Sequence, residues 1–213
     1  MKTDALIDLL ATGSGPVPRH ALPRRFAAAV AIGATGALVL LLAIFGVNPA
    51  LRDFIELPNF WIKMSFTVAL ACAGLVASQR LARPGVTVGH GIWLVLLPVL
   101  ALWLLSLVLL ATAEPTTRMY LVLGNTWSKC PINIVLLSTP VFLAGLWALR
   151  GLAPTEHRFA GAALGLFSGA IGACVYGLHC PELAPPFLAV WYLLGILVPC
   201  AIGFVAGPRL LRW

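Results

Sequence analysis

Two cysteine-proline pairs lie in polar gaps of an otherwise apolar chain, and each has a basic neighbour. Cys130 in WSKCPIN follows Lys129, and Cys180 in GLHCPEL follows His179. A nearby positive charge lowers the pKa of a thiol and makes it more reactive. A proline after each cysteine resists helix continuation, which holds the thiol at a helix edge. These residues are therefore the first candidates for chemistry.

The two cysteines are compatible with three arrangements. They could form a static disulfide, bind a soft metal ion or act as a redox switch. Two thiolates, the imidazole of His179 and the carboxylate of Glu182 are ligands that Zn²⁺ or a similar soft cation accepts. The spacing is less specific than a pair of CxxC motifs, so the three arrangements stay open at this point.

The elements that must position these residues are transmembrane helices. The chain has 213 residues, is 61% hydrophobic and only 10% charged, and its mean hydropathy is +0.98. Soluble domains carry about 25% charged residues. The net charge of +7 comes from residues beside apolar segments rather than from a basic patch, so it does not predict nucleic-acid binding.

The predicted fold is all-α, a polytopic membrane protein built as a six-transmembrane-helix bundle with a short N-terminal cytoplasmic helix. A spanning helix needs about 20 mostly apolar residues. No acidic residue falls inside any such segment, and Lys63, near the start of the second, is expected to snorkel toward the membrane surface. The predicted spans are Phe26–Val47, Phe60–Gln79, Gly91–Thr112, Ile132–Leu149, Phe159–Leu178 and Phe187–Ala206.

Lysine and arginine residues in the gaps predict the orientation, because cytoplasmic loops carry an excess of both. The side that holds both termini contains Lys2, Arg19, Arg24, Arg25, Arg80, Arg83, Arg150, Arg158, Arg209 and Arg212. The opposite side contains Arg52, Lys63, Arg118 and Lys129. We therefore expect a multi-pass membrane protein with both termini in the cytoplasm.

This orientation places both cysteine-proline loops on the outer face. In a Gram-negative bacterium that face is the oxidising periplasm. The other three cysteines, Cys72, Cys174 and Cys200, fall inside spans and are expected to be small buried hydrophobes.

A stripe of small residues marks the fifth span as a central helix. Such residues recur at every fourth position, which aligns them on one helix face and allows another helix to approach closely. They are Gly161, Gly165, Gly169, Ala173 and Gly177.

The spans bring no convergent charged groups, Walker loop, HExxH motif or nucleophile elbow. We therefore expect no enzymatic activity and no small-molecule substrate. The alternative is a thiol-redox or metal-handling membrane enzyme or carrier that uses Cys130 and Cys180. Such oxidases usually add a CxxC pair, which the sequence lacks.

The N-terminal segment MKTDALIDLLATGSGPVPRH predicts a short helix on a tether. Thr3 and Asp4 are suitable first residues, and the segment from Thr12 to Pro18 is expected to end the helix. An acidic, apolar helix suits the groove of a protein partner better than an anionic membrane surface. We predict a partner-binding helix and tether in residues 1–25 and a transmembrane sensor domain in residues 26–213. The predicted partner-binding residues are Thr3, Asp4, Leu6, Ile7, Asp8, Leu9 and Leu10.

The whole chain resembles the NrsF-like family of bacterial membrane anti-sigma factors. The resemblance rests on the MKTD start, the six spans, Cys130 in WSKCPIN, the LRGLAP stretch with Leu149, Arg150, Ala153 and Pro154, the glycine stripe and the His179-Cys180 pair. It implies a protein that holds an ECF-type sigma factor inactive at the inner membrane. It also implies that the outer cysteines respond to metal ions or oxidants.

The resemblance and the residues together predict a mechanism. The N-terminal helix holds the sigma factor, and a signal at Cys130 and Cys180, with His179 and Glu182 beside them, shifts the bundle and releases it. We expect no obligatory cofactor, although a soft metal ion such as Zn²⁺ or Cd²⁺ would bind transiently. The expected partners are the sigma factor and the lipid bilayer, with no direct contact to nucleic acid.

Overall fold

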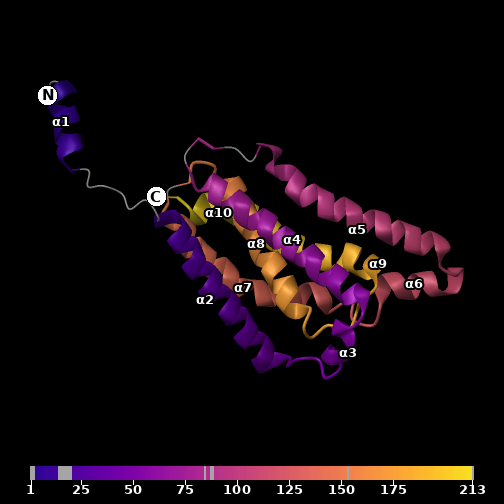
Figure 1. The fold of residues 1–213 in the computed structure, drawn as a ribbon. Helices are drawn as coiled ribbons and strands as arrows, with labels where there is room; N and C mark the ends of the chain where they lie inside the picture. Colours follow the sequence, from indigo (N-terminus) through magenta and orange to yellow (C-terminus); the bar gives the residue numbers. More distant parts are fainter. Residues whose placement is uncertain (1–2, 14–20, 84, 87–88, 153, 213) are drawn as a thin grey trace.

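The computed structural model describes residues 3–13, 21–83, 85–86, 89–152 and 154–212, and the secondary structure of these residues is helical (Figure 1). Within these described ranges, six helices are long and apolar enough to cross a membrane, as the hydropathy pattern predicts. They lie within α2 (Ala21–Ile44), α4 (Pro58–Leu81), α5 (Trp93–Thr112), α7 (Cys130–Arg150), α8 (His157–Tyr176) and the run from α9 to α10 (Pro185–Leu210).

Several helices begin before the residue predicted from hydropathy, because prolines form their first turns. The second span starts at Pro58 rather than Phe60, and the sixth starts at Pro185 rather than Phe187. The missing N–H of proline costs nothing in a first turn, where that donor has no partner in the helix. The sixth span comprises α9 (Pro185–Phe187), a π-helical turn η2 (Leu188–Tyr192) and α10 (Leu193–Leu210).

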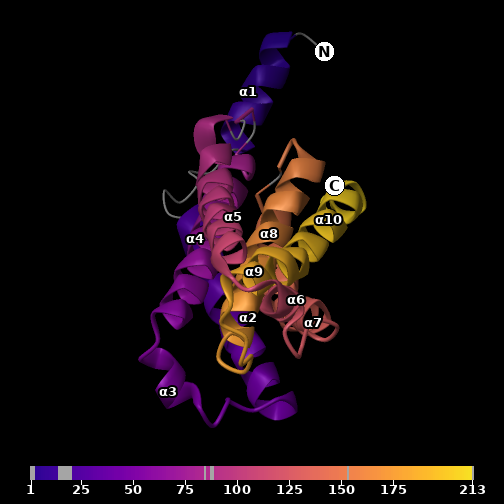
Figure 2. The same ribbon diagram turned by 90° about the vertical axis from the view of Figure 1, so that its right-hand side faces the viewer.

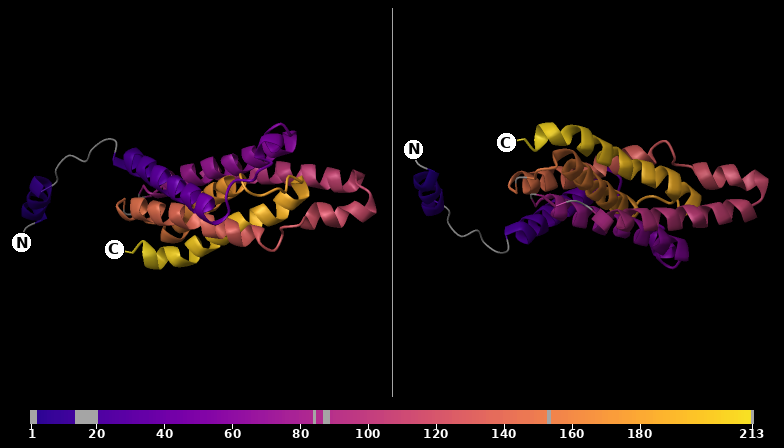
Figure 3. Two further views of the ribbon diagram at one scale, coloured as in Figure 1. Left: turned by 90° about the horizontal axis from the view of Figure 1, so that it is seen from below. Right: turned by 90° about the horizontal axis from the view of Figure 1, so that it is seen from above.

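Three short elements that the sequence analysis did not predict lie in the gaps. They are α3 (Leu51–Ile55), η1 (Gly89–Ile92) and α6 (Pro115–Leu123). α6 turns back from the end of α5, and in both views of Figure 3 this turn extends farthest from α1.

Helix α8 forms the centre of the bundle and lies between α4 and α10 (Figure 2). Three members of the small-residue stripe face the backbone of α10: Gly161 lies against Gly203, Gly165 against Pro199 and Gly169 against Ile196. A Cβ atom on Gly169 would lie 2.7 Å from the Ile196 carbonyl oxygen, closer than real Cβ atoms approach. The absence of side chains at these positions therefore allows the two helices to meet backbone to backbone.

The other face of α8 packs on α4. A Cβ atom on Gly74 of α4 would lie 2.6 Å from the backbone nitrogen of Phe167 in α8. Of the remaining stripe residues, Ala173 is fully buried, and Gly177 lies just beyond the end of α8 against Met64 of α4.

Helix α5 lies at the periphery. Only Leu102 and Ser106 are buried along it, whereas Trp93, Leu97 and Leu104 are among its exposed apolar residues. Exposed apolar side chains of this kind suit contact with lipid.

Helix α1 (Thr3–Gly13) lies apart from the bundle in Figures 1 and 3. The helix ends at Gly13, within the segment from Thr12 to Pro18 that was expected to end it. The rest of the predicted tether, residues 14–20, lies outside the described residues.

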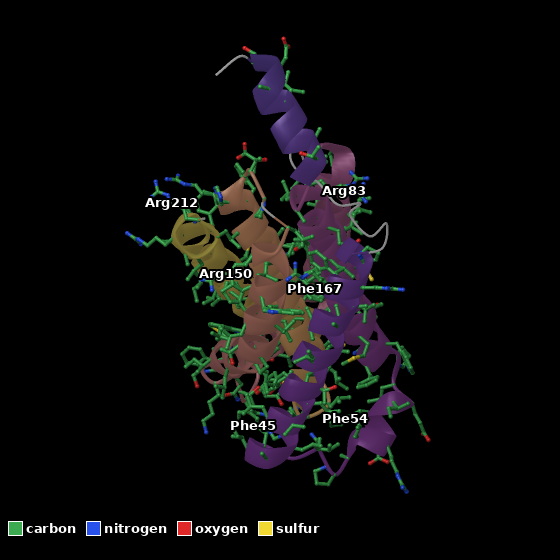
Figure 4. All side chains as sticks on the ribbon, turned by 90° about the vertical axis from the view of Figure 1, so that its left-hand side faces the viewer. Phe45, Phe54, Arg83, Arg150, Phe167 and Arg212 are labelled. Carbon is green, nitrogen blue, oxygen red and sulfur yellow. The ribbon has the colours of Figure 1, made fainter. Side chains whose placement is uncertain are left out.

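The two ends of the bundle differ in character. Figure 4 shows Arg83 and Arg212 toward the end nearer α1, and Phe45 and Phe54 toward the opposite end. The loops that carry the two cysteine-proline pairs lie at the end with Phe45, because His179 contacts that ring.

Candidate functional site

Helix ends position the two cysteines. Cys130 is the first residue of α7, and its N–H donates to the carbonyl oxygen of Thr126 at 2.9 Å. Helix α8 ends at Tyr176, and the N–H of Cys180 donates to the carbonyl oxygen of Tyr176 at 2.9 Å. The following proline, Pro181, cannot donate a backbone hydrogen bond. Each thiol is thereby fixed at a helix edge.

The structure brings the two thiols together. Both cysteines are fully buried and free, and their side chains interact with each other. The Thr126 hydroxyl oxygen also lies 3.9 Å from the Cys180 sulfur. The interaction with the Cys130 side chain and the charge of Lys63 lower the pKa of Cys180 against the opposing effect of burial. Cys180 is therefore the more acidic thiol of the pair.

Lys63 contributes the positive charge of this site, and the expectation that it snorkels to the membrane surface is wrong. Its side chain is fully buried, and Nζ donates to the carbonyl oxygens of Cys180 at 3.0 Å and Glu182 at 3.2 Å. The same Nζ lies 5.8 Å from the ring centroids of Phe60 and Tyr192. Helix α4 thus delivers a cation directly to the loop that carries Cys180.

Two tyrosines enclose the thiols on the side of α8 and η2. Tyr192 is fully buried, and Tyr176 is almost so, with ring centroids 6.1 Å apart. The Tyr176 hydroxyl accepts a hydrogen bond of 3.3 Å from Nδ2 of Asn133 in α7. Both tyrosines belong to the same buried cluster as Cys130 and Cys180.

Glu182 binds the other cysteine loop. Its Oε1 accepts a hydrogen bond of 2.7 Å from the N–H of Asn125, and only 9% of the residue is exposed. Its carboxylate lies beneath Gly124, which has a positive φ of 54°. The contact joins the loop before α7 to the loop after α8.

His179 faces a different partner. Its Nδ1 lies 3.1 Å from the carbonyl oxygen of Gly46, its ring lies 5.4 Å from that of Phe45, and its own carbonyl accepts from Nδ2 of Asn48 at 3.1 Å. Within the described part of the chain, no group of three or more His, Cys, Asp or Glu side chains is arranged to hold a metal ion. The predicted set is thus divided, with a thiol pair at the centre and His179 and Glu182 bound to neighbouring loops.

The remaining candidates lie outside this cluster. Lys129, the sequence neighbour of Cys130, is exposed. Cys174 and Cys200 are partly buried, but Cys72 is exposed, so the expectation of burial is wrong for Cys72.

In helix α1, Thr3, Asp4 and Ile7 are exposed, and 57% of Ile7 is accessible. The side chains of Leu6, Asp8, Leu9 and Leu10 lie outside the described part of the structure, although their backbone is helical.

Comparison with known proteins identifies the family of this chain. A family model described as the negative regulator of sigma F, NrsF, matches residues 10–213. The chain belongs to the NrsF family. Among curated NrsF proteins, the probable anti-sigma-F factor of Azospira oryzae is 46% identical over 213 residues, and the anti-sigma-F factor of Caulobacter vibrioides is 42% identical over 215 residues. Both alignments cover the full length of each chain.

No solved structure matches the chain. The NrsF family match starts within α1 and includes the six apolar helices and both cysteine loops. The predicted resemblance to this family is therefore confirmed.

Proposed function

We propose that this protein is an anti-sigma factor that holds an ECF-type sigma factor inactive at the bacterial inner membrane. Membership of the NrsF family and the names of two full-length relatives, both anti-sigma-F factors, support a sigma factor as the partner. The six apolar helices support a membrane location. Regulation then consists of binding and release, and requires no chemistry on the sigma factor itself.

The cytoplasmic end of the bundle is, in this proposal, the end nearer α1. Arg83 and Arg212 lie toward it in Figure 4, and positive residues favour the cytoplasmic side. Helix α1 stands apart from the bundle on this side and exposes Asp4 and Ile7. A helix with acidic and apolar exposed residues is suited to a groove on a folded partner.

The single observation that carries the sensing part is the buried contact between Cys130 and Cys180. These residues are 50 positions apart in the sequence and come from two different loops, yet their buried side chains interact. A metal ion bound by both sulfurs, or a disulfide between them, would change the contact between the start of α7 and the loop after α8. That loop also contacts α4 through Lys63. The proposed signal is therefore a metal ion or an oxidant in the periplasm that acts on this pair and causes release of the sigma factor.

The test is purification of the full chain from membranes with a tag at its C-terminus, followed by mass spectrometry of bound proteins. We expect one ECF-type sigma factor to co-purify, and to be lost after treatment of the cells with Cd²⁺ or peroxide. A sigma factor of another class would overturn the ECF assignment. The Cys130→Ser variant provides the matched control, and release from this variant under the same treatment would contradict sensing by the pair.

A further inference from the structure

We infer that Lys63 is the positioning residue of the Cys130–Cys180 pair and directs it toward oxidation to a disulfide by a two-electron oxidant of the peroxide class. This inference rests on the proposed sensing function and names the chemistry of that site. The basic residue that acts on the pair is then Lys63, which lies 67 positions before Cys130, and not Lys129, its neighbour in the sequence.

The first step of the argument is the placement of the Cys180 segment. Nζ of Lys63 donates to the carbonyl oxygens of Cys180 and Glu182, which bracket Pro181. These two bonds fix the backbone on both sides of the proline, and so fix the direction in which the Cys180 thiol points. An ammonium group has three donors, and the two carbonyls leave one of them for the negative charge of the thiol pair.

The second step is the sign of the charge. Lys63 is fully buried, so its field acts on the sulfurs through a medium that screens charge far less than water. A buried cation stabilises an anionic sulfur, which is the nucleophilic form of cysteine. The same cation repels a divalent metal ion. The nearest further ligands in the sequence are Glu182 and His179, and both have other partners. The Glu182 carboxylate accepts a hydrogen bond from the Asn125 N–H, and Nδ1 of His179 lies at the carbonyl oxygen of Gly46.

The third step is a reaction that the pair can complete with peroxide alone. The anionic sulfur of Cys180 attacks one peroxide oxygen, the O–O bond breaks, and sulfenic acid and hydroxide form. The hydroxide takes the proton of the Cys130 thiol and becomes water. The Cys130 sulfur then attacks the Cys180 sulfur, the S–O bond breaks, and hydroxide leaves as the disulfide forms. The two sulfurs lose two electrons, and the peroxide oxygens gain them.

The fourth step links this reaction to the rest of the bundle. A disulfide carries no negative charge, so its formation removes the largest negative charge that acts on the buried ammonium of Lys63 and leaves the smaller effect of Glu182. A buried charge that has lost most of its compensation is unfavourable, so arrangements in which α4 moves Lys63 toward water become more favourable. Helix α4 packs on α8 through Gly74 and Phe167, midway along the bundle. The charge change at the thiol pair is thereby passed to the central helix.

The experiment uses the full chain purified reduced into lipid nanodiscs. Disulfide formation with hydrogen peroxide is followed by intact mass, and Cd²⁺ binding is followed by calorimetry. For Lys63→Met we expect the oxidation rate to fall by roughly tenfold or more, since the charge that favours the nucleophilic sulfur is lost. We expect Cd²⁺ binding to become tighter, a gain that a merely structural defect would not produce. Lys129→Met is the matched control and should oxidise at the wild-type rate.

Two further variants keep the test decisive if Lys63→Met does not fold. Lys63→Gln keeps a donor for the carbonyls without the charge and should behave like Lys63→Met, whereas Lys63→Arg keeps the charge and should retain most of the rate. Wild-type oxidation rates in Lys63→Gln, or wild-type protein that binds Cd²⁺ more tightly than Lys63→Gln, would overturn the inference. If oxidation follows the expected order but the sigma factor stays bound, the proposed function fails and the inference about Lys63 stands.

Discussion

Gly124→Ala should destabilise the site in two ways, by backbone strain and by a clash with the side chain of Glu182. Gly124 has φ of 54° and ψ of −161°, a region of backbone conformation that is essentially limited to glycine. A Cβ atom there would lie 2.7 Å from the Cδ and Oε2 atoms of Glu182 and 2.8 Å from its Oε1. The new methyl group therefore strains the backbone and displaces the carboxylate that bonds to the Asn125 N–H.

The expected cost has two parts. Backbone strain of this kind costs about 1–3 kcal/mol. Loss of a hydrogen bond to a charged group costs about 1.5–3 kcal/mol, so the free energy of unfolding should fall by about 4 kcal/mol in all. Gly46→Ala is the matched control, because Gly46 has φ of 71° and no atom within 4 Å of its Cβ position. That variant should lose only the strain, about 1–2 kcal/mol.

The assay is reversible unfolding of the purified protein in mixed micelles of increasing SDS fraction. A double-mutant cycle with Glu182→Ala isolates the contact, because removal of the carboxylate leaves the added methyl group nothing to displace. The coupling free energy between the two substitutions should be about 2 kcal/mol. Equal losses in Gly124→Ala and Gly46→Ala, or a coupling near zero, would show that the Glu182 carboxylate does not tie the two loops together.

Three other outcomes are expected from the same structure. Changing Leu6 and Leu9 to Asp should release the sigma factor from membranes while the bundle stays folded, as measured by fractionation. If the sigma factor stays on the membrane, the binding surface lies instead on the loops around Arg80–Arg83 or Arg150–Arg158. The same loss of sigma-dependent transcription after Cd²⁺ or peroxide is expected in Cys130→Ser, Cys180→Ser and the double variant, because a bridge between the two residues disappears when either is removed. Cys72→Ala should respond normally, and additive defects at the two paired cysteines would refute the paired mechanism. Both native thiols of the pair are buried, so the orientation of the protein in the membrane is best measured with Ser128→Cys and Glu156→Cys in chains whose other cysteines are replaced. A membrane-impermeant maleimide applied to spheroplasts should label the Ser128→Cys chain and not the Glu156→Cys chain.

Hydropathy was sufficient to predict all six spans, since each must present about 20 apolar residues to lipid. The short helices α3 and α6 were missed because their polar composition gives no such signal. Pro115 directly after Glu114 could have indicated the start of α6, because proline favours the first helical turn.

Lys63 shows where sequence reasoning reached its limit. A lysine near the start of a span normally extends to the membrane surface, and nothing in its neighbours distinguishes it from that case. Its partners, the carbonyls of Cys180 and Glu182, are more than 100 positions away and become neighbours only when α4 packs beside the end of α8. The useful signal was its location, because an ionisable residue at membrane depth is usually functional.

The separation of the four candidate ligands in the structure has a similar reason. Adjacent positions in a loop point in different directions, so His179 turns to Gly46 while Cys180 turns to Cys130. The sequence places His179 and Cys180 next to each other, but it contains no information about the carbonyl at the end of α2 that the imidazole faces.

The contrast between α5 and α8 has a consequence for how the protein is made. Helix α5 buries only two residues, so it can reside in lipid as soon as it leaves the translocon. Helix α8 has no side chains to cover its backbone along Gly161, Gly165 and Gly169, and the surface that covers this face belongs to α10, which is synthesised after α8. Unpaired glycine faces are poor lipid partners, because lipid tails cannot match the close backbone contact. The glycine face of α8 is therefore covered only once α10 has been inserted, and a chain truncated before α10 should be a substrate for membrane quality control.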